Sequence, residues 1–201
     1  MKNKSKILVL FDFDGTITYK DSMIEFIKFS IGKTKFYFGL IILSPLLLLY
    51  KMNIIANDIA KQKLITYFYK GYDKESFLKI ADRYSLKEID KIVYPKSLQK
   101  IKWHQSKNHH IVIVTASIEN WVKGWCDRNQ FDLIATQLEV KENKITGKFS
   151  TKNCYGLEKV NRIKQKYNLS EYDLIYAYGN GRGDKEMLEI ADKSYFKHFN
   201  F

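Results

Sequence analysis

Two carboxylates stand two residues apart in this sequence, directly after a short apolar run. Residues 6–12 are rich in Ile, Leu and Val and are predicted to form a buried strand. Asp12 is the last residue of this strand, and Asp14 follows two residues later. Because residues i and i+2 of an extended chain face the same side, both carboxylates are expected at the end of that strand. Such a pair can bind Mg²⁺, or divide the roles of nucleophile and general acid–base. The alternative is a turn in which one Asp is a capping residue.

Polar groups also follow two other predicted strands. Thr115 ends a β-branched run, Lys159 lies early in a predicted helix, and Asn180 and Asp184 lie on a Gly-rich turn at residues 179–184. Taken singly, each has a plain alternative: a helix cap, a solvated helix face and a tight loop. Taken together, they predict a ligand crevice at the carboxyl ends of the strands, with carboxylates, a hydroxyl, an ammonium and backbone amides available.

The elements that would position these groups alternate between strand and helix in the second half of the chain. Alternation of this length is typical of a largely parallel sheet with crossover helices, so the predicted fold class is α/β. The predicted elements are a helix at 95–103, a strand at 110–115, a helix at 117–128, a hairpin of 133–140 with 144–149, a helix at 155–167, a strand at 173–178 and a helix at 183–191.

A long helical stretch separates the first strand from the rest. Residues 21–94 have helical periodicity throughout and are predicted to be an insertion, whereas residues 1–20 and 95–201 are predicted to form the α/β core. Asp21 stands at the junction of the two parts. It is interpreted as a helix N-cap, and the alternative is that it contacts substrate.

Composition restricts the class of protein. The 201 residues carry 34 Lys and Arg against 22 Asp and Glu, so the net charge is +12. This charge is interpreted as a solvated cationic surface, with attraction to an anionic partner as the alternative. No nucleic-acid-binding signature is present, so no nucleic acid is expected as a partner. Cys126 and Cys154 form no disulfide framework, and the apolar run after Lys6 is too short for a signal peptide, so a cytoplasmic location is expected.

One segment of the insertion is unusually apolar. Residues 36–50 carry no charge and lie between Lys35 and Lys51. As a helix they would be about 22 Å long, shorter than the ~30 Å hydrocarbon core, and Pro45 interrupts them. The favoured interpretation is a buried helical hairpin of the insertion. The alternative is a surface that contacts lipid, which would make a peripheral membrane contact and some membrane association part of the function.

The order of these motifs resembles the haloacid dehalogenase (HAD) superfamily of phosphohydrolases. The residues that carry the resemblance are Asp12-x-Asp14-Gly15-Thr16, then Thr115, then Lys159, then Gly179-Asn180-x-x-x-Asp184. The insertion resembles the family's helical cap of type 1 on a Rossmann-like core. The motifs look most like the phosphoserine-phosphatase-like subfamily IB, and within it the phosphatidylglycerophosphatase C-like branch. The sequence Thr115-Ala116-Ser117 replaces the Ser-Gly-Gly of true phosphoserine phosphatases, which argues against phosphoserine as the substrate.

The resemblance implies a role for each motif residue. Asp12 would attack phosphorus and carry an aspartyl-phosphate, and Asp14 would act as general acid and then as general base. Thr115 and Lys159 would hold the phosphoryl oxygens. The Mg²⁺ site would be provided by Asp12, Asp14 through its backbone carbonyl, Asn180 and Asp184.

The resulting prediction is a Mg²⁺-dependent phosphatase that hydrolyses a small phosphate monoester, with a lipid phosphate as a candidate substrate. One departure supports a second hypothesis: Asn180 stands where the family usually has Asp, so metal affinity should be lower. The alternative is therefore a catalytically impaired relative that binds a phospho-ligand or lipid. No oligomeric state is predicted.

Overall fold

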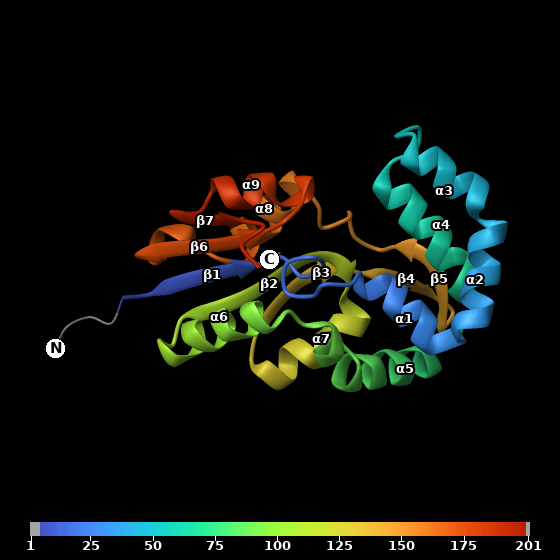
Figure 1. Ribbon diagram of the computed structural model, residues 1–201, viewed down its shortest axis with the longest axis horizontal. Helices are drawn as coiled ribbons and strands as arrows, with labels where there is room; N and C mark the ends of the chain where they lie inside the picture. Colours follow the sequence, from blue (N-terminus) through green and yellow to red (C-terminus); the bar gives the residue numbers. More distant parts are fainter. Residues whose placement is uncertain (1–4, 200–201) are drawn as a thin grey trace.

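The computed structural model describes residues 5–199, and the first four residues of the basic N-terminus lie outside that range. Its centre is a five-stranded parallel sheet in the order β3-β2-β1-β6-β7 (Figure 1). This arrangement confirms the predicted α/β class. The strands of this sheet are β1 (Ile7–Phe11), β2 (His110–Ile118), β3 (Asp132–Thr136), β6 (Leu174–Gly179) and β7 (Lys193–Phe196).

Helices account for most of the remaining chain. Within the insertion they are α1 (Ser22–Ile31), α2 (Lys33–Ile42), α3 (Ser44–Lys51), α4 (Asn57–Tyr69), α5 (Lys74–Lys87) and the 3₁₀ helix η1 (Ile89–Ile92). Within the core they are α6 (Pro95–Ser106), α7 (Glu119–Asn129), α8 (Leu157–Lys166), α9 (Lys185–Glu189) and the 3₁₀ helices η2 (Leu169–Glu171) and η3 (Arg182–Asp184).

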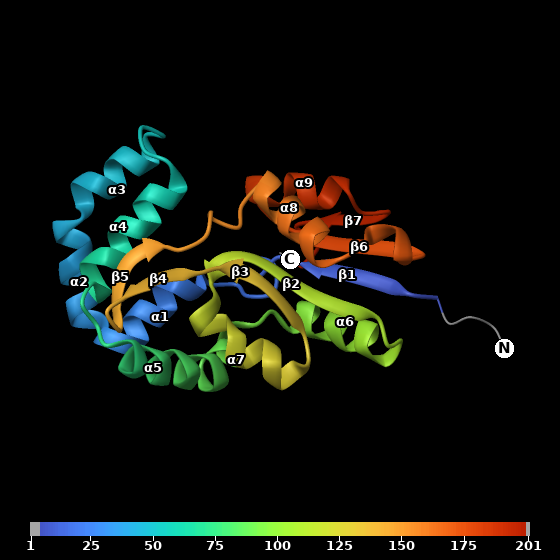
Figure 2. The same ribbon diagram turned by 180° about the vertical axis from the view of Figure 1, so that it is seen from behind.

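The central strand β1 is apolar on both faces because both faces are covered. Val9 and Phe11 pack with α6 and α7, whereas Leu8 and Leu10 pack with α8 and α9 (Figures 1 and 2). Successive side chains of a strand point to opposite sides, so a strand inside a two-sided sandwich is a continuous hydrophobic run. This burial fixes the end of β1, and with it the position of Asp12.

The insertion lies at one end of the molecule as a cap, and a hairpin from the core sequence is part of it (Figures 1 and 2). Strands β4 (Leu138–Lys141) and β5 (Lys144–Phe149) form a separate antiparallel pair. Ile145 exchanges backbone hydrogen bonds with the chain that follows α4, at Gly71 and Tyr72. At Gly147 (φ +85°), a Cβ atom would lie 2.4 Å from the Thr66 Cα atom, so this close contact requires glycine.

The sequence predictions were wrong at several boundaries. Residues 133–140 are not one strand of a hairpin: β3 belongs to the main sheet, and only β4 pairs with β5. The β4–β5 hairpin, which lies within the predicted core residues 95–201, packs against helix α4 of the insertion, and the division into core and cap stays a prediction. The helix predicted from residue 117 begins at Glu119, because β2 continues to Ile118. Strand β7 was not predicted.

The apolar segment 36–50 is helical but not buried. It forms most of α2 and α3, where Phe36 and Gly39 are buried and most of the other side chains are partly or fully exposed. The preferred expectation of a buried hairpin was therefore wrong. Within residues 5–199, no single helix is long and apolar enough to cross a membrane; α2 and α3 reach that length and hydropathy only as a pair, which is bent by 67°.

Candidate active site

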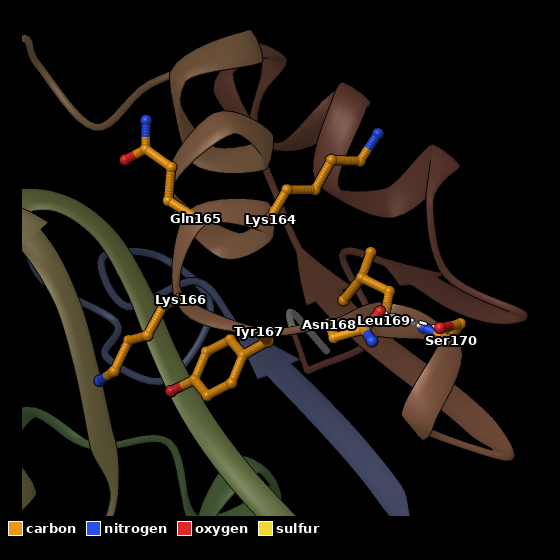
Figure 3. Close-up of a pocket in the computed structure, with 7 residues that line it drawn as sticks. All are labelled: Lys164, Gln165, Lys166, Tyr167, Asn168, Leu169 and Ser170. Atoms are coloured by element: carbon orange, nitrogen blue, oxygen red, sulfur yellow. Dashed lines mark hydrogen bonds between the residues drawn. The ribbon is translucent and has the colours of Figure 1, made fainter.

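A cavity of about 260 Å³ opens where the carboxyl ends of β1, β2 and β6 meet the cap. All six sequence-predicted site residues line it: Asp12, Asp14, Thr115, Lys159, Asn180 and Asp184. A larger depression of about 550 Å³ lies elsewhere, after α8, where consecutive residues from Lys164 to Ser170 form it (Figure 3). That depression contains lysines but no carboxylate, so the smaller cavity is the candidate site.

Lys159 is the charged centre beneath the cavity. The residue is 1 % exposed, and its Nζ atom donates to Asp12 Oδ1 at 2.7 Å, to Asp184 Oδ1 at 2.6 Å and to the Val114 carbonyl at 2.8 Å. Burial alone would lower the pKa of Lys159, but Asp12 and Asp184 outweigh burial and raise it. The ammonium therefore stays charged and has all three of its protons engaged.

Asp12 is fixed through both carboxylate oxygens. Lys159 donates to Oδ1, and the Thr16 hydroxyl donates to Oδ2 at 2.9 Å. The Asp12 backbone N–H donates to the Tyr178 carbonyl, which extends the pairing of β1 with β6 by one residue. The carboxylate is thus held in one orientation at the cavity wall, as an anionic nucleophile requires.

Asp14 is held by two serines. Its Oδ1 atom accepts from the Ser22 N–H at 2.7 Å, and its Oδ2 atom accepts from the Ser117 hydroxyl. The two serine hydroxyls lie 2.8 Å apart. Burial first, and the charge of Asp21 second, raise the pKa of Asp14 to about 7. Near neutral pH this carboxyl can both give and take a proton, which suits a general acid–base.

Asp184 lines the cavity and is held by Lys159 and by the Gly-rich turn. Its Oδ1 atom accepts from Lys159, and its Oδ2 atom accepts from the backbone N–H groups of Asn180 (3.0 Å) and Gly181 (2.9 Å). Both oxygens are therefore committed to the protein, and the residue is buried. Asp184 orients Lys159 and the Gly-rich turn, and its role as a metal ligand stays a prediction.

Asn180 lies across the turn that follows the carboxylate pair. At Gly15 (φ +80°), an added Cβ would be 2.0 Å from Asn180 Nδ2, so only glycine allows this approach. Thr115 is buried, and its hydroxyl oxygen accepts from the Ser117 N–H at 2.9 Å. The Thr115 hydroxyl proton remains available at the cavity wall to which the residue contributes.

The oxygen donors fit a magnesium ion held by few protein ligands. Among residues 5–199, no cluster of three His, Cys, Asp or Glu side chains could hold a metal. The cavity is lined by Asp12, Asp14, Asn180 and Asp184, and Asp14 would contribute its backbone carbonyl, which leaves its carboxyl free for proton transfer. Mg²⁺ commonly uses one or two carboxylates and completes its shell with water and phosphate oxygens. These four residues would hold it.

The cap contributes residues that sequence reasoning did not identify. Tyr50, Asn57 and Lys61 line the cavity from above; Asn57 Nδ2 donates to the Tyr50 hydroxyl at 2.9 Å, and Lys61 Nζ lies 3.5 Å from the Ala116 carbonyl. No motif marks these positions, because only the fold brings α3 and α4 over the sheet. Asp21 both caps α1, by accepting from the Ile24 N–H, and lines the cavity.

The fold is shared with known proteins. The chain belongs to the haloacid dehalogenase-like hydrolase family, whose profile matches residues 9–189. It is therefore an enzyme of the hydrolase class. It is similar to Protein CicA of Caulobacter vibrioides, with 31% identity over 195 residues that cover 96% of this chain and 86% of that protein.

Solved structures show the same fold at low identity. A Bordetella pertussis protein of unknown function has a TM-score of 0.80 and 16% identity, over 94% of this chain and 89% of its own. A phosphoserine phosphatase solved as a phospho-aspartyl intermediate analogue has a TM-score of 0.61 and 21% identity, over 95% of this chain and 86% of its own. Each likeness establishes the architecture and leaves the substrate open.

Proposed function

We propose that this chain is a Mg²⁺-dependent phosphatase that hydrolyses a phosphate monoester through an aspartyl-phosphate on Asp12. The observation that carries the proposal is that Asp12 and Asp14 line the same cavity and that the buried ammonium of Lys159 contacts Asp12 at 2.7 Å. The phospho-aspartyl form described for the similarly folded phosphoserine phosphatase supports the same chemistry.

In the first half of the reaction, an Asp12 oxygen forms a bond to phosphorus while the bond from phosphorus to the leaving oxygen breaks. Asp14 gives its proton to that leaving oxygen, so the alcohol departs neutral. Lys159 holds Asp12, and Thr115 has a hydroxyl proton to donate to a phosphoryl oxygen. When bound, Mg²⁺ would neutralise charge on the phosphoryl group.

In the second half, water loses a proton to Asp14 and its oxygen attacks phosphorus. The bond between phosphorus and Asp12 then breaks, which releases phosphate and restores the free carboxylate. A single group serves both directions because its pKa is about 7. The two serines that hold Asp14 keep it directed to the same site in both steps.

The substrate that we propose is small and phosphorylated, with a lipid phosphate as a second candidate. The cationic side chains of Lys61 and Arg182 at the cavity suit an anionic group beyond the phosphate itself. We also propose that the chain belongs to subfamily IB and its phosphatidylglycerophosphatase C-like branch, and that it acts in the cytoplasm. The helical insertion between β1 and β2 supports the subfamily.

The test is release of phosphate from p-nitrophenyl phosphate with Mg²⁺. The proposal expects activity that EDTA abolishes and that added Mg²⁺ restores. A second candidate, a binding protein with an impaired site, is favoured by one observation: Asn180 supplies an uncharged ligand where a carboxylate would bind the cation better. Absence of turnover at saturating Mg²⁺, together with binding of inorganic phosphate, would favour this second candidate.

A further inference from the structure

The outer side of the cap carries an apolar surface that the active site does not use. We call it the α2–α3 face, and its exposed members are Tyr37, Phe38, Ile41, Ile42, Leu48 and Leu49. Ile41 is 70% exposed and Leu48 is 58% exposed. Isolated exposed side chains of this kind are ordinary, but six exposed apolar side chains on two consecutive helices are more than chance exposure, and such a concentration typically marks a binding surface.

The charges within the segment that forms the α2–α3 face are all positive. No Asp or Glu occurs between Glu25 and Asp58, and Lys33, Lys35 and Lys51 stand at the ends of the two helices. Each of these three lysines is exposed. An apolar surface with a cationic border complements an anionic, partly apolar partner.

This charge pattern discriminates between possible partners. A second copy of the chain would bring the same lysines face to face, and each copy carries a net charge of +12. That repulsion opposes self-association through this face. An anionic lipid bilayer offers negative headgroups to the lysines and an apolar layer to the side chains between them, so it satisfies both features at once.

The geometry suits lying on a bilayer rather than crossing it. The two helices are bent by 67° relative to each other. Pro45 and Leu48 line a shallow depression on α3, so the apolar surface continues past the bend. Tyr37 and Tyr50 are exposed near the two ends of the segment, and tyrosine is a side chain enriched at the membrane–water boundary.

We propose that the α2–α3 face docks on an anionic lipid bilayer and thereby places the active-site cavity beside the membrane surface. Tyr50 connects the two, because it ends the apolar segment and also lines the cavity. Its hydroxyl accepts a hydrogen bond from Asn57 in the next helix, which fixes this edge of the face to the cavity wall. Docking does not depend on catalysis, so it can be tested separately from the proposed reaction.

The test measures co-sedimentation of the whole chain with vesicles of phosphatidylcholine, with and without phosphatidylglycerol. We expect binding only to vesicles that contain phosphatidylglycerol, and weaker binding as salt increases. The double variant Ile41→Asn/Leu48→Asn should bind at least about tenfold more weakly. Neutralising the lysines in Lys33→Gln/Lys35→Gln/Lys51→Gln should have an effect of similar size.

A matched control excludes a general effect of exposed apolar residues. Leu157 and Phe196 are 61% and 58% exposed but lie outside the cap, so Leu157→Asn/Phe196→Asn should bind vesicles as the parent does. Hydrolysis of p-nitrophenyl phosphate without vesicles should not change in Ile41→Asn/Leu48→Asn, which shows that the variant is folded. Equal vesicle binding by the cap variant and the parent would overturn the proposal. A parent dimer that this variant converts to monomer would also overturn it, because the face would then be an interface between copies.

Discussion

The ammonium of Lys159 lies 2.6 Å from Asp184 Oδ1, and both side chains are buried. Lys159 comes from helix α8 and Asp184 from the turn after β6, so this ion pair joins two elements that meet only in the folded chain. The same ammonium contacts Asp12 at 2.7 Å. One ammonium therefore bridges two carboxylates beneath the cavity, and its loss has consequences for stability as well as for activity.

Replacing Lys159 should destabilise the fold. Lys159→Met keeps the length of the side chain but leaves Asp12 and Asp184 buried without a cation, which costs about 3–5 kcal/mol. Urea unfolding would measure the loss. Lys164→Met is the control, because Lys164 is an exposed lysine on the same helix, and its effect should lie within about 0.5 kcal/mol. Equal effects of the two changes would mean that the buried charge cluster contributes nothing specific.

Replacing Asp12 should remove catalysis and leave the structure intact. Asp12→Asn retains the shape but not the anionic nucleophile, so turnover should fall by at least about a thousandfold. Beryllofluoride, a mimic of the acyl-phosphate, should also no longer bind. Phosphate release and calorimetry would measure the two effects. Substantial turnover in a pure Asp12→Asn sample would rule out the covalent mechanism.

Much of the fold could be predicted because periodicity reports burial. The strand ending at Phe11 and the strand beginning at His110 are continuous apolar runs, and both are buried as expected. Strand β7 could not be found in this way, because Lys193–Phe196 is a short edge strand with three exposed side chains. The division of residues 133–140 between two sheets occurs at Gln137 without Gly or Pro, so the sequence carries no turn signal there.

Part of the candidate site could also be predicted from the sequence, for a related reason. The motif residues end apolar strands, so the topological rule alone places them at one edge of the sheet. The hydrogen-bond partner of each group depends on the tertiary structure. Sequence spacing cannot show that Lys159 and two backbone amides donate to the two oxygens of Asp184. In the same way, Ser117 looks like a helix start, yet it lies in strand β2 and holds Asp14.

Removing the charge of Asp14 should stabilise the protein in a pH-dependent manner. The ordinary carboxyl pKa of 3.8 rises to about 7 in the fold, first because of burial. Between these two pH values the folded state therefore binds more protons than the unfolded chain. The contribution of Asp14 protonation to the free energy of unfolding is fully present below about pH 3.8 and is lost as pH rises through about 7. Without divalent cations at pH 8, Asp14→Asn should be more stable than the parent by about 2 kcal/mol, after allowance for partial solvent screening.

Thermal unfolding across pH would check this expectation. The advantage of Asp14→Asn should shrink toward pH 4, where the parent carboxyl is already neutral in the fold. Asp127→Asn, at an exposed position on α7, serves as the control and should show no such trend. A stability difference independent of pH would show that the charge of Asp14 is not the cause.

Restoring a carboxylate at position 180 should strengthen Mg²⁺ binding. Asn180→Asp adds one negative ligand to a partly shielded site, which is worth about one to two kcal/mol at an effective dielectric of roughly 20. This corresponds to about five- to thirtyfold in affinity, measurable by titration calorimetry. Asn168→Asp makes the same change in charge at an exposed position after α8 and should have no effect. Unchanged or weaker affinity in Asn180→Asp would mean that this side chain is not a metal ligand.

The β4–β5 hairpin also determines when the cap can finish folding. Helix α4 ends at Tyr69, and strand β5, which packs against it, begins at Lys144, about 75 residues later. At a synthesis rate of about 5–20 residues per second, the cap helices wait roughly 4–15 seconds for this partner to leave the ribosome. During that interval the side of α4 that later packs on β5 is uncovered, next to helices that are apolar on their outer side. We therefore expect the nascent cap to be the part of the chain that most needs a chaperone.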